Sequence, residues 1–173
     1  RFVLAIPDFL GSLIATRIYS AVHQRWAAID LDVLPSARAD NAWRLETGEL
    51  TAAIGGIVPD MPGTSRLRLY EEDLVLVLRN GHPLAQSTID LETFGRHNQA
   101  LVGLEDHYDP EQTLVDRRLH ALGQRRRVAL RQRSFFGTLH TVLGTDLITL
   151  LPRTMAAWAV LRHDVLVRPA PLE

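Results

Sequence analysis

Short polar and glycine-containing segments follow several stretches that have the pattern of buried strands, and they are the positions most suited to binding a small molecule. They are Pro7–Ser12, Ser36-Ala37, Gly55-Gly56-Ile57, Glu105–Tyr108 and Ser134–Phe136. In an open α/β sheet, ligands collect at the carboxyl ends of strands, where helix N-termini present free N–H groups. Hydroxyls would orient the ligand, glycines would allow close backbone approach, and a phenylalanine ring would supply an apolar wall. This pattern suits a small carboxylate or phenolic compound.

The predicted binding residues occupy these strand ends, with two additions later in the chain. They are Pro7, Asp8, Ser12, Ser36, Gly55, Gly56, Asp106, His107, Tyr108, Ser134, Phe135, Phe136, His140 and Thr149.

Several of these residues also have a purely structural interpretation. Ser134 could serve only as an N-cap, Gly55-Gly56 only as a turn, and His107-Tyr108 only as an exposed loop. Adjacent helical residues point about 100° apart, so we expect one of the two phenylalanines in the core and the other at the ligand. His140 lies four residues after Phe136 and would share its helix face.

The residue types argue against catalysis and against a bound metal. The chain has no Cys, and all 19 of its Lys-or-Arg positions are Arg, so thiol and Schiff-base chemistry are excluded. The seven His lack the spacing of a metal site, and no nucleophile elbow, phosphate-binding loop or dinucleotide-binding glycine motif is present. The charged runs Glu71–Asp73 and Arg125–Arg127 are interpreted as solvated. We therefore expect no enzyme activity, no metal and no cofactor.

Strand-like and helix-like segments alternate along the chain, which predicts an α/β protein. The expected strands cover residues 2–6, 31–34, 50–54, 67–72, 74–78, 100–103, 128–131, 147–151 and 165–167. The first expected helix begins after Asp8, a plausible N-cap. The other expected helices cover residues 41–47, 91–94, 111–122, 135–143 and 153–161. The pattern divides into two α/β units, one before about Leu74 and one after it.

Composition and charge narrow the function further. The chain is 46% hydrophobic and 23% charged, as in an ordinary soluble domain. Its net charge of −1 and pI of about 6.7 lack the cationic excess of a nucleic-acid-binding surface. The apolar stretch Met155–Leu161 is far shorter than the roughly 20 residues of a membrane-spanning helix. The chain begins at Arg1 without a signal-peptide pattern, so we expect a cytoplasmic protein that lacks an N-terminal piece.

Four local patterns in a particular order resemble one family. They are Leu45-Glu-Thr-Gly-Glu-Leu-Thr-Ala-Ala-Ile54, Leu69-Tyr-Glu-Glu-Asp73, Leu78-Arg-Asn-Gly-His-Pro-Leu-Ala85 and Gly144-Thr-Asp-Leu-Ile-Thr-Leu-Leu-Pro152. Their order and separations are similar to those of the effector-binding domain of LysR-type transcriptional regulators. Thr145–Ile148, with Arg127–Leu130 and Phe135, looks like the branch that responds to aromatic compounds, which includes nodulation, salicylate and nitroaromatic regulators. Thr51 stands where the family usually has an acidic residue.

The resemblance implies the fold of type 2 periplasmic binding proteins, with two Rossmann-like lobes joined by two crossover strands. The crossovers would lie near Leu69–Leu74 and Thr149–Pro152, so lobe I would comprise residues 1–72 and 150–173 and lobe II residues 73–149. A small aromatic or carboxylate effector would bind between the lobes. Its effect would pass to a winged helix-turn-helix outside this chain, the only part that contacts DNA. The chain also ends before the terminal segment that such domains normally have.

The same resemblance implies a homodimer, and a tetramer of the full-length protein. The first helix and second strand would pack on a partner through Ala15, Tyr19, Val22, Leu31 and Val33, although core positions have the same residue types. The alternative function is a periplasmic-type solute-binding protein or a small-molecule enzyme on the same fold. A signal peptide upstream would favour solute binding, whereas a winged helix-turn-helix would favour the regulator.

Overall fold

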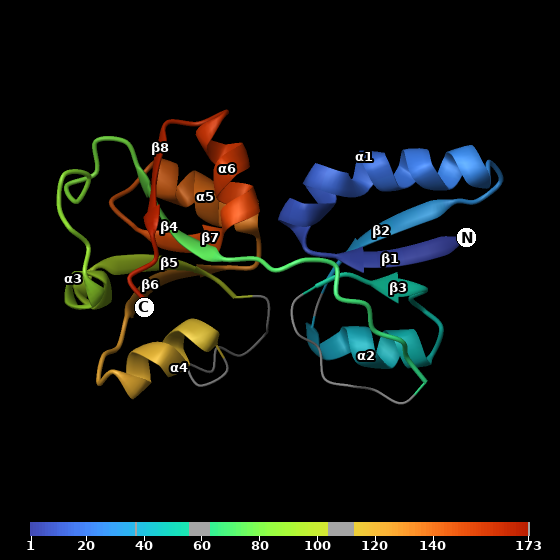
Figure 1. The fold of residues 1–173 in the computed structure, drawn as a ribbon, viewed down its shortest axis with the longest axis horizontal. Coiled ribbons are helices and arrows are strands. Elements are labelled where there is room, and N and C mark those ends of the chain that lie inside the picture. The colour runs from blue at the N-terminus through green and yellow to red at the C-terminus, as the bar shows by residue number, and fades with distance from the viewer. Residues whose placement is uncertain (37, 56–62, 104–112, 173) are drawn as a thin grey trace. The chain divides into compact units, whose positions relative to one another are not determined.

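The computed structural model describes residues 1–36, 38–55, 63–103 and 113–172 (Figure 1). The chain divides into two compact units, Arg1–Tyr70 and Glu71–Glu173. Both contain helices and strands, which confirms the α/β class expected from the sequence. Within the described ranges, no helix combines the length and the apolar character needed to cross a membrane.

The first unit is a three-stranded parallel sheet with a helix on each face (Figure 1). Its elements are β1 (Phe2–Ile6), α1 (Asp8–Arg25), β2 (Leu31–Pro35), α2 (Arg38–Glu46) and β3 (Ala52–Ala53). The strand order is β2-β1-β3, so β1 is central and has a parallel neighbour on both sides. Leu4, Ala5 and Ile6 are buried because both faces of a central parallel strand are covered.

The second unit is a mixed sheet with helices on both faces (Figure 1). Its elements are β4 (Leu74–Arg79), α3 (Leu91–Arg96), β5 (Asn98–Val102), α4 (Leu114–Ala121), β6 (Arg127–Gln132), α5 (Phe135–Leu143), β7 (Thr149–Pro152), α6 (Arg153–Val160) and β8 (Val165–Pro169). β4 pairs antiparallel with β7 and β8, and β5 pairs parallel with β6. A parallel bridge between Gln99 and Ile148 joins the two groups, which gives the order β6-β5-β7-β4-β8.

Strand β4 lies at the centre of the second core. Leu76 and Leu78 pack in one cluster with Phe94 of α3 and Leu119 of α4. The side chains of a strand alternate between the two faces, so Val75 and Val77 face the opposite side, where α5 and α6 contact the strand. This two-sided burial explains why the run Leu74–Leu78 is continuously apolar.

The expected and observed elements differ at two positions in or next to the first unit. The segment 67–72 was expected to be a strand, but it belongs to neither sheet, and Leu67 and Leu69 are 79% and 59% exposed. An apolar run becomes a strand only where a neighbouring strand pairs with it. Asp8 was expected as the N-cap of α1, but Pro7 has that position and Asp8 is the first helical residue. The Asp8 carboxylate accepts the Phe9 N–H at 2.7 Å.

The last elements of the chain differ from the lobe division expected from the sequence, which placed residues 150–173 with residues 1–72. Strand β8 is paired with β4, with Leu166 opposite Leu78 and Arg168 opposite Leu76. Thr149–Pro152 is paired with β4 as well, so it is a strand of the second sheet and not a crossover. Local pattern predicts that a run forms a strand, whereas the choice of neighbour depends on residues far away in sequence.

His82 connects the turn after β4 with the loop before β7. Its side chain is buried, and Nδ1 accepts the Leu84 N–H at 2.9 Å. Because Nδ1 accepts, Nε2 carries the ring proton and donates to the Asp146 carbonyl at 3.1 Å. Arg79 donates to the Asp146 carboxylate from Nε and Nη2 at 3.0 and 2.6 Å. These bonds give the His82-Pro-Leu-Ala85 pattern a structural role.

A buried ion pair fixes the start of α4. Arg126 donates to the Asp116 carboxylate from Nε at 2.7 Å and from Nη2 at 2.6 Å. The two side chains are 3% and 9% exposed. Thr113 caps the helix by accepting the Asp116 N–H at 3.0 Å, and its hydroxyl also donates to the same carboxylate. Such a bidentate ion pair has a fixed geometry and is shielded from water.

We predict that Asp116→Ala lowers the free energy of unfolding of the second unit by about 3–5 kcal/mol, because the Arg126 guanidinium stays buried without its partner. Urea unfolding followed by circular dichroism measures the change. The matched control is Arg96→Ala, which breaks the exposed Glu92–Arg96 pair and should cost less than about 1 kcal/mol. Equal costs for the two variants would contradict the role of the buried pair.

Candidate ligand-binding site

The carboxyl ends of the three parallel strands meet at one edge of the first sheet. The Ser36 N–H donates to the Ile6 carbonyl at 3.0 Å, and the Ile54 N–H donates to the Ala5 carbonyl at 2.7 Å. These two bonds hold the segments that leave the strands at one level. The structure thereby brings together four of the predicted residues, which are Pro7, Asp8, Ser36 and Gly55.

The Ser36 hydroxyl lies between α2 and the end of β3. It accepts a hydrogen bond from Asn41 Nδ2 at 2.7 Å. A Cβ atom placed on Gly55 would lie 3.7 Å from Ser36 Oγ, so the glycine is a direct neighbour of the hydroxyl. Asn41 is only 3% exposed and was not among the residues predicted from sequence. Its spacing of four from Leu45 on α2 is the signal that would have placed it on the inward face.

An open hollow of about 320 Å³ lies between the start of α1 and the end of β2. Its lining consists of Ile6, Asp8, Gly11, Ser12, Val33, Leu34 and Pro35, which includes two predicted binding residues. A Cβ on Gly11 would approach the Ile6 side chain to 3.2 Å, so the glycine allows α1 to pack closely on β1. The Ser12 hydroxyl is exposed and donates to the Asp8 carbonyl of its own helix at 3.0 Å.

The second unit has a comparable edge where the parallel strands β5 and β6 end. The Gly103 N–H donates to the Gln132 carbonyl at 2.8 Å, and α5 begins two residues later. Ser134 is the N-cap of α5 and accepts the Gly137 N–H at 3.0 Å. The structural interpretation of Ser134 is therefore confirmed, and a role in ligand binding stays a prediction.

Side-chain caps also begin the two preceding helices of this unit. Asp90 accepts the Thr93 N–H at 2.8 Å, and Thr113 caps α4 as described above. The hydrogen bond to the Thr93 side chain, followed by the bond to its backbone, lowers the pKa of the Asp90 carboxyl below its ordinary value. Asp90 and Thr113 thus have a structural role as helix caps.

Phe136 and His140 share one face of α5, as their spacing predicted, and this face contacts the α6 region. The Phe136 ring meets Trp158 edge to face with centroids 5.1 Å apart, and the His140 ring meets His163 at 5.9 Å. Phe135 and Phe136 are both half-buried, so the division into one core ring and one ring at the ligand stays a prediction.

Thr149 lies on the α5–α6 side of the sheet with 1% of its surface exposed, and its hydroxyl has no hydrogen-bond partner within the described part of the chain. The predicted residues Gly56, Asp106, His107 and Tyr108 lie outside the described residues.

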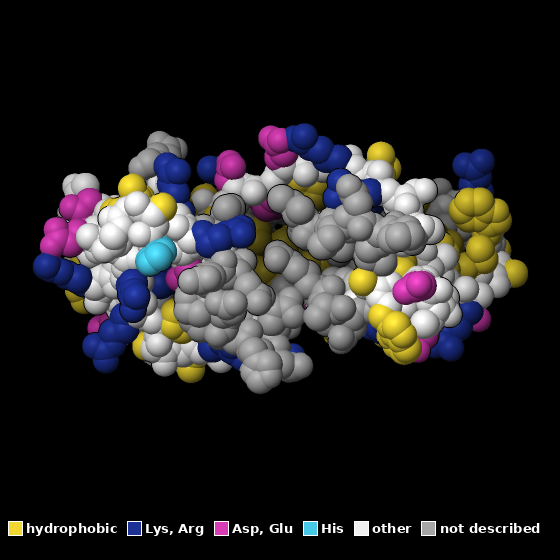
Figure 2. All heavy atoms as spheres, turned by 90° about the horizontal axis from the view of Figure 1, so that it is seen from below, with side chains coloured by type: hydrophobic (Ala, Val, Ile, Leu, Met, Phe, Trp, Pro, Cys, Tyr) yellow, Lys and Arg dark blue, Asp and Glu magenta, His cyan; other side chains and the backbone are white. Residues whose placement is uncertain are grey.

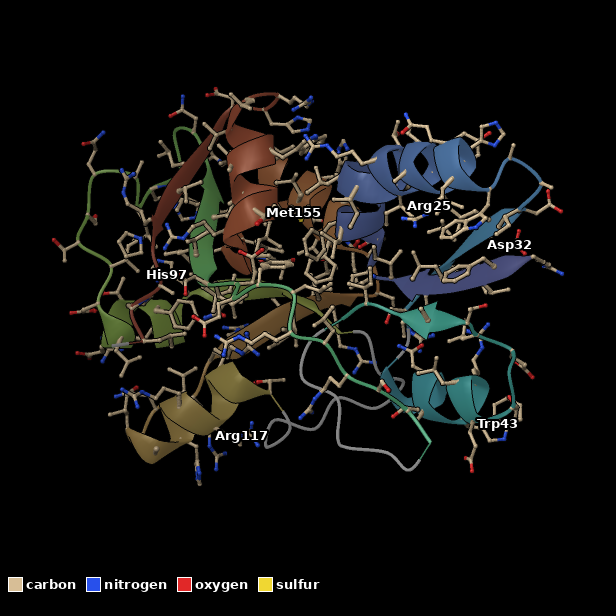
Figure 3. The ribbon with its side chains drawn as sticks, turned by 45° about the vertical axis from the view of Figure 1, so that its right-hand side comes forward. Arg25, Asp32, Trp43, His97, Arg117 and Met155 are labelled. Atoms are coloured by element: carbon tan, nitrogen blue, oxygen red, sulfur yellow. The ribbon has the colours of Figure 1, made fainter. Side chains whose placement is uncertain are left out.

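The residues predicted for self-association lie at the surface of α1 and β2. Tyr19 and Val33 are 51% and 38% exposed, and Ala15, Val22 and Leu31 are half-buried. The Tyr19 ring stacks on His23 with centroids 5.4 Å apart, and both line a second open hollow of about 710 Å³. The remaining lining residues are Arg1, Ala27, Ile29, Asp30, Leu31 and Asp32, of which Asp32 is labelled in Figure 3.

Two tryptophans of the first unit have exposed side chains. Trp26 and Trp43 are 54% and 57% exposed. Trp43 projects from the side of α2 that is turned away from the sheet (Figure 3). The Arg25 guanidinium lies 5.4 Å from the centroid of the Trp26 ring. An exposed large aromatic side chain is the type of group that is enriched in protein interfaces.

Charged side chains of both signs are interspersed on the face of the molecule shown in Figure 2. Arg side chains alternate there with Asp and Glu, which agrees with the net charge of −1. Among residues 1–36, 38–55, 63–103 and 113–172, no group of three or more His, Asp or Glu is placed to hold a metal ion.

Comparison of the whole chain with known families identifies the class of protein to which these two units belong. Residues 1–173 match the family described as the LysR substrate binding domain, and the chain belongs to this family. It is 32% identical over 173 residues to the HTH-type transcriptional regulator SyrM of Rhizobium etli, with 98% of this chain and 49% of that protein covered. It is 30% identical over 189 residues to SyrM 1 of Sinorhizobium fredii (strain NBRC 101917 / NGR234), with the same coverage of both. The chain thus spans about half the length of these relatives.

Solved structures show the same fold at lower sequence identity. The probable transcriptional regulator PA0477 of Pseudomonas aeruginosa superposes with a TM-score of 0.85 at 22% identity, over 99% of this chain and 56% of that one. The regulatory domain of MexT from the same organism gives 0.78 at 19% identity, over 99% and 82%. The fold is that of LysR regulatory domains, the type 2 periplasmic-binding-protein-like fold, as expected from the sequence.

We predict that Ser134→Ala lowers the free energy of unfolding by about 1 kcal/mol, because the Gly137 N–H loses its acceptor. Ser134→Asp should keep nearly full stability, since aspartate is an equally good N-cap. Both values follow from chemical denaturation of the unliganded chain. An alanine variant as stable as the wild type would show that the cap contributes nothing.

Proposed function

We propose that this chain senses a small effector for a LysR-type transcriptional regulator. The effector is aromatic, carries a hydroxyl or carboxylate group, and is held at the carboxyl-end edge of the first sheet. The observation that carries the proposal is the alignment of Pro7-Asp8, Ser36 and Gly55 at one level by the hydrogen bonds of β1. Backbone and short side chains at such an edge are accessible to a ligand, as in open α/β sheets generally.

The signal would arise from different affinities of the effector for two arrangements of the units. A ligand shifts a conformational equilibrium only by the difference of its binding free energies for the two states. The boundary of the two units, between Tyr70 and Glu71, lies within the segment 64–73, which contains no helix or strand. We propose that changes in its backbone angles accompany effector binding.

DNA contact would belong to a part of the protein outside this chain. The relatives named above are HTH-type regulators, and this chain spans about half of their length. The near-neutral net charge, and the mixture of positive and negative side chains on the face shown in Figure 2, support a sensor that does not itself bind DNA. A winged helix-turn-helix in the remaining part would bind the DNA, and a protein with that task works in the cytoplasm. We propose no catalytic activity for the chain.

Self-association would use the exposed surface of α1 and β2. Tyr19 and Val33 have the exposure that a partner surface requires, and Trp26 adds a large apolar side chain on the segment that follows α1. Aromatic side chains contribute strongly to interfaces when a partner desolvates them. We propose that these residues contact a second copy of the chain.

We predict that Tyr19→Glu raises the dissociation constant of the dimer at least about tenfold, because a charge replaces an aromatic contact. Sedimentation velocity over a concentration series measures this constant. Arg117→Glu is the control, since Arg117 is exposed on α4 of the second unit (Figure 3) and should leave the constant unchanged. Equal sedimentation of wild type and Tyr19→Glu would contradict the proposed surface.

We also predict that an aromatic acid or a phenol stabilises the chain against heat. A compound present at about 100 times its dissociation constant should add about 2.7 kcal/mol to the free energy of unfolding. Thermal-shift measurements with salicylate, benzoates, phenols and flavonoids test this. Stabilisation by a sugar or an amino acid, with none by any aromatic compound, would overturn the assignment of an aromatic effector.

A further inference from the structure

Asn41 carries a buried hydrogen-bond acceptor that no described residue of the chain uses. The residue is 3% exposed, and its Nδ2 donates to Ser36 Oγ at 2.7 Å. Its Oδ1 atom is inaccessible to solvent and has no hydrogen-bond partner within the described part of the chain. Leaving such an acceptor unpaired is costly, and folded proteins rarely do so without a reason.

The hydroxyl of Ser36 provides the complementary group. A serine hydroxyl has one proton to donate and two lone pairs to accept with. Because Ser36 Oγ accepts from Asn41, its own proton is available for another acceptor, and none is present among the described residues. Ser36 therefore keeps a donor and Asn41 an acceptor, on two side chains that are joined by one hydrogen bond.

The position of this pair is suited to a ligand. Ser36 directly follows β2 and is half-buried, at the edge where the three parallel strands end. Gly55 is exposed beside it, and a Cβ there would already lie 3.7 Å from Ser36 Oγ. A Cβ branch at position 55 would add atoms next to the Ser36 hydroxyl, whereas glycine adds none.

We infer that Ser36 and Asn41 together recognise a neutral hydroxyl group of the effector, such as a phenol, and reject a carboxylate at this point. A ligand hydroxyl accepts from Ser36 and donates to Asn41 Oδ1, so both protein groups are satisfied. A carboxylate only accepts, so it would leave the Asn41 oxygen unpaired next to a negative charge. A site built to bond a hydroxyl rejects analogues that cannot complete the pair. This inference rests on the proposed effector-sensing function and specifies the effector's chemical class.

The test compares two ligands that differ only in the group to be recognised, 4-hydroxyacetophenone and 4-acetylbenzoate. Isothermal titration calorimetry with the whole chain measures both dissociation constants. We expect the wild type to prefer the phenol by about tenfold or more. Asn41→Leu and Ser36→Ala should each remove this preference, whereas Asn41→Leu should not lower the stability of the free chain, since it replaces an incompletely paired buried amide by an apolar group of similar size.

Gln99 supplies a matched control in the second unit. It is 1% exposed, its Nε2 donates to the Phe94 carbonyl at 2.7 Å, and its Oε1 is unpaired in the described structure. Gln99→Leu thus makes the same kind of change at the amino end of β5, and it should leave the preference for the phenol intact. Gly55→Val should weaken binding of the phenol by covering the hydroxyl, while Gly55→Ala should have a small effect.

The outcomes separate this inference from the function on which it rests. Binding of the carboxylate in preference to the phenol, or an equal effect of Asn41→Leu on both ligands, overturns the hydroxyl assignment and leaves effector sensing standing. Absence of binding by either compound, and by the wider aromatic panel, overturns both. A loss of preference in Gln99→Leu as large as in Asn41→Leu shows that the effect is not local and also overturns the assignment.

Discussion

In the first unit, two backbone hydrogen bonds of the central strand determine which residues can meet at a ligand. The Ile6 carbonyl accepts from Ser36 on one side of β1, and the Ala5 carbonyl accepts from Ile54 on the other. Because all three strands are parallel, their carboxyl ends lie at the same edge. A shift of pairing by one residue would turn the side chains of a strand to the opposite face. The burial of Leu4 to Ile6 prevents such a shift, so core packing determines the geometry of the edge.

Residues at strand ends differ in how much hydrogen-bonding capacity they retain for a ligand. The Ser134 hydroxyl accepts the Gly137 N–H as the cap of α5, and the Ser12 hydroxyl donates its proton to the Asp8 carbonyl. Ser36 and Asn41 form one bond with each other and keep one donor and one acceptor. The cost of a buried unpaired acceptor, about 1–3 kcal/mol, is a reason to expect a partner for it. The groups left available, rather than location alone, distinguish the Ser36–Asn41 pair from Ser12 and Ser134.

The second unit is stabilised by a different set of interactions. Strand β4 is buried on both faces, and its end is joined to Asp146 through Arg79 and through the ring of His82. The Asp116–Arg126 pair holds α4 against the segment before β6. Breaking a buried pair of this kind is costly because the remaining charge is not solvated.

The sequence by itself determined the α/β class and most element positions, because hydrophobic periodicity directly reflects which residues are buried. It placed β1 and α5 at their observed bounds, and it identified Pro7, Asp8, Ser36 and Gly55 as strand-end residues. The tertiary structure alone decided that β8 pairs with β4, that the segment 67–72 joins no sheet, and that Phe136 and His140 face the α6 region. It also decided that Asn41 is buried with an unpaired oxygen. Periodicity reports which face of an element is apolar, but the partner that covers this face comes from distant parts of the chain, and only the folded arrangement specifies it.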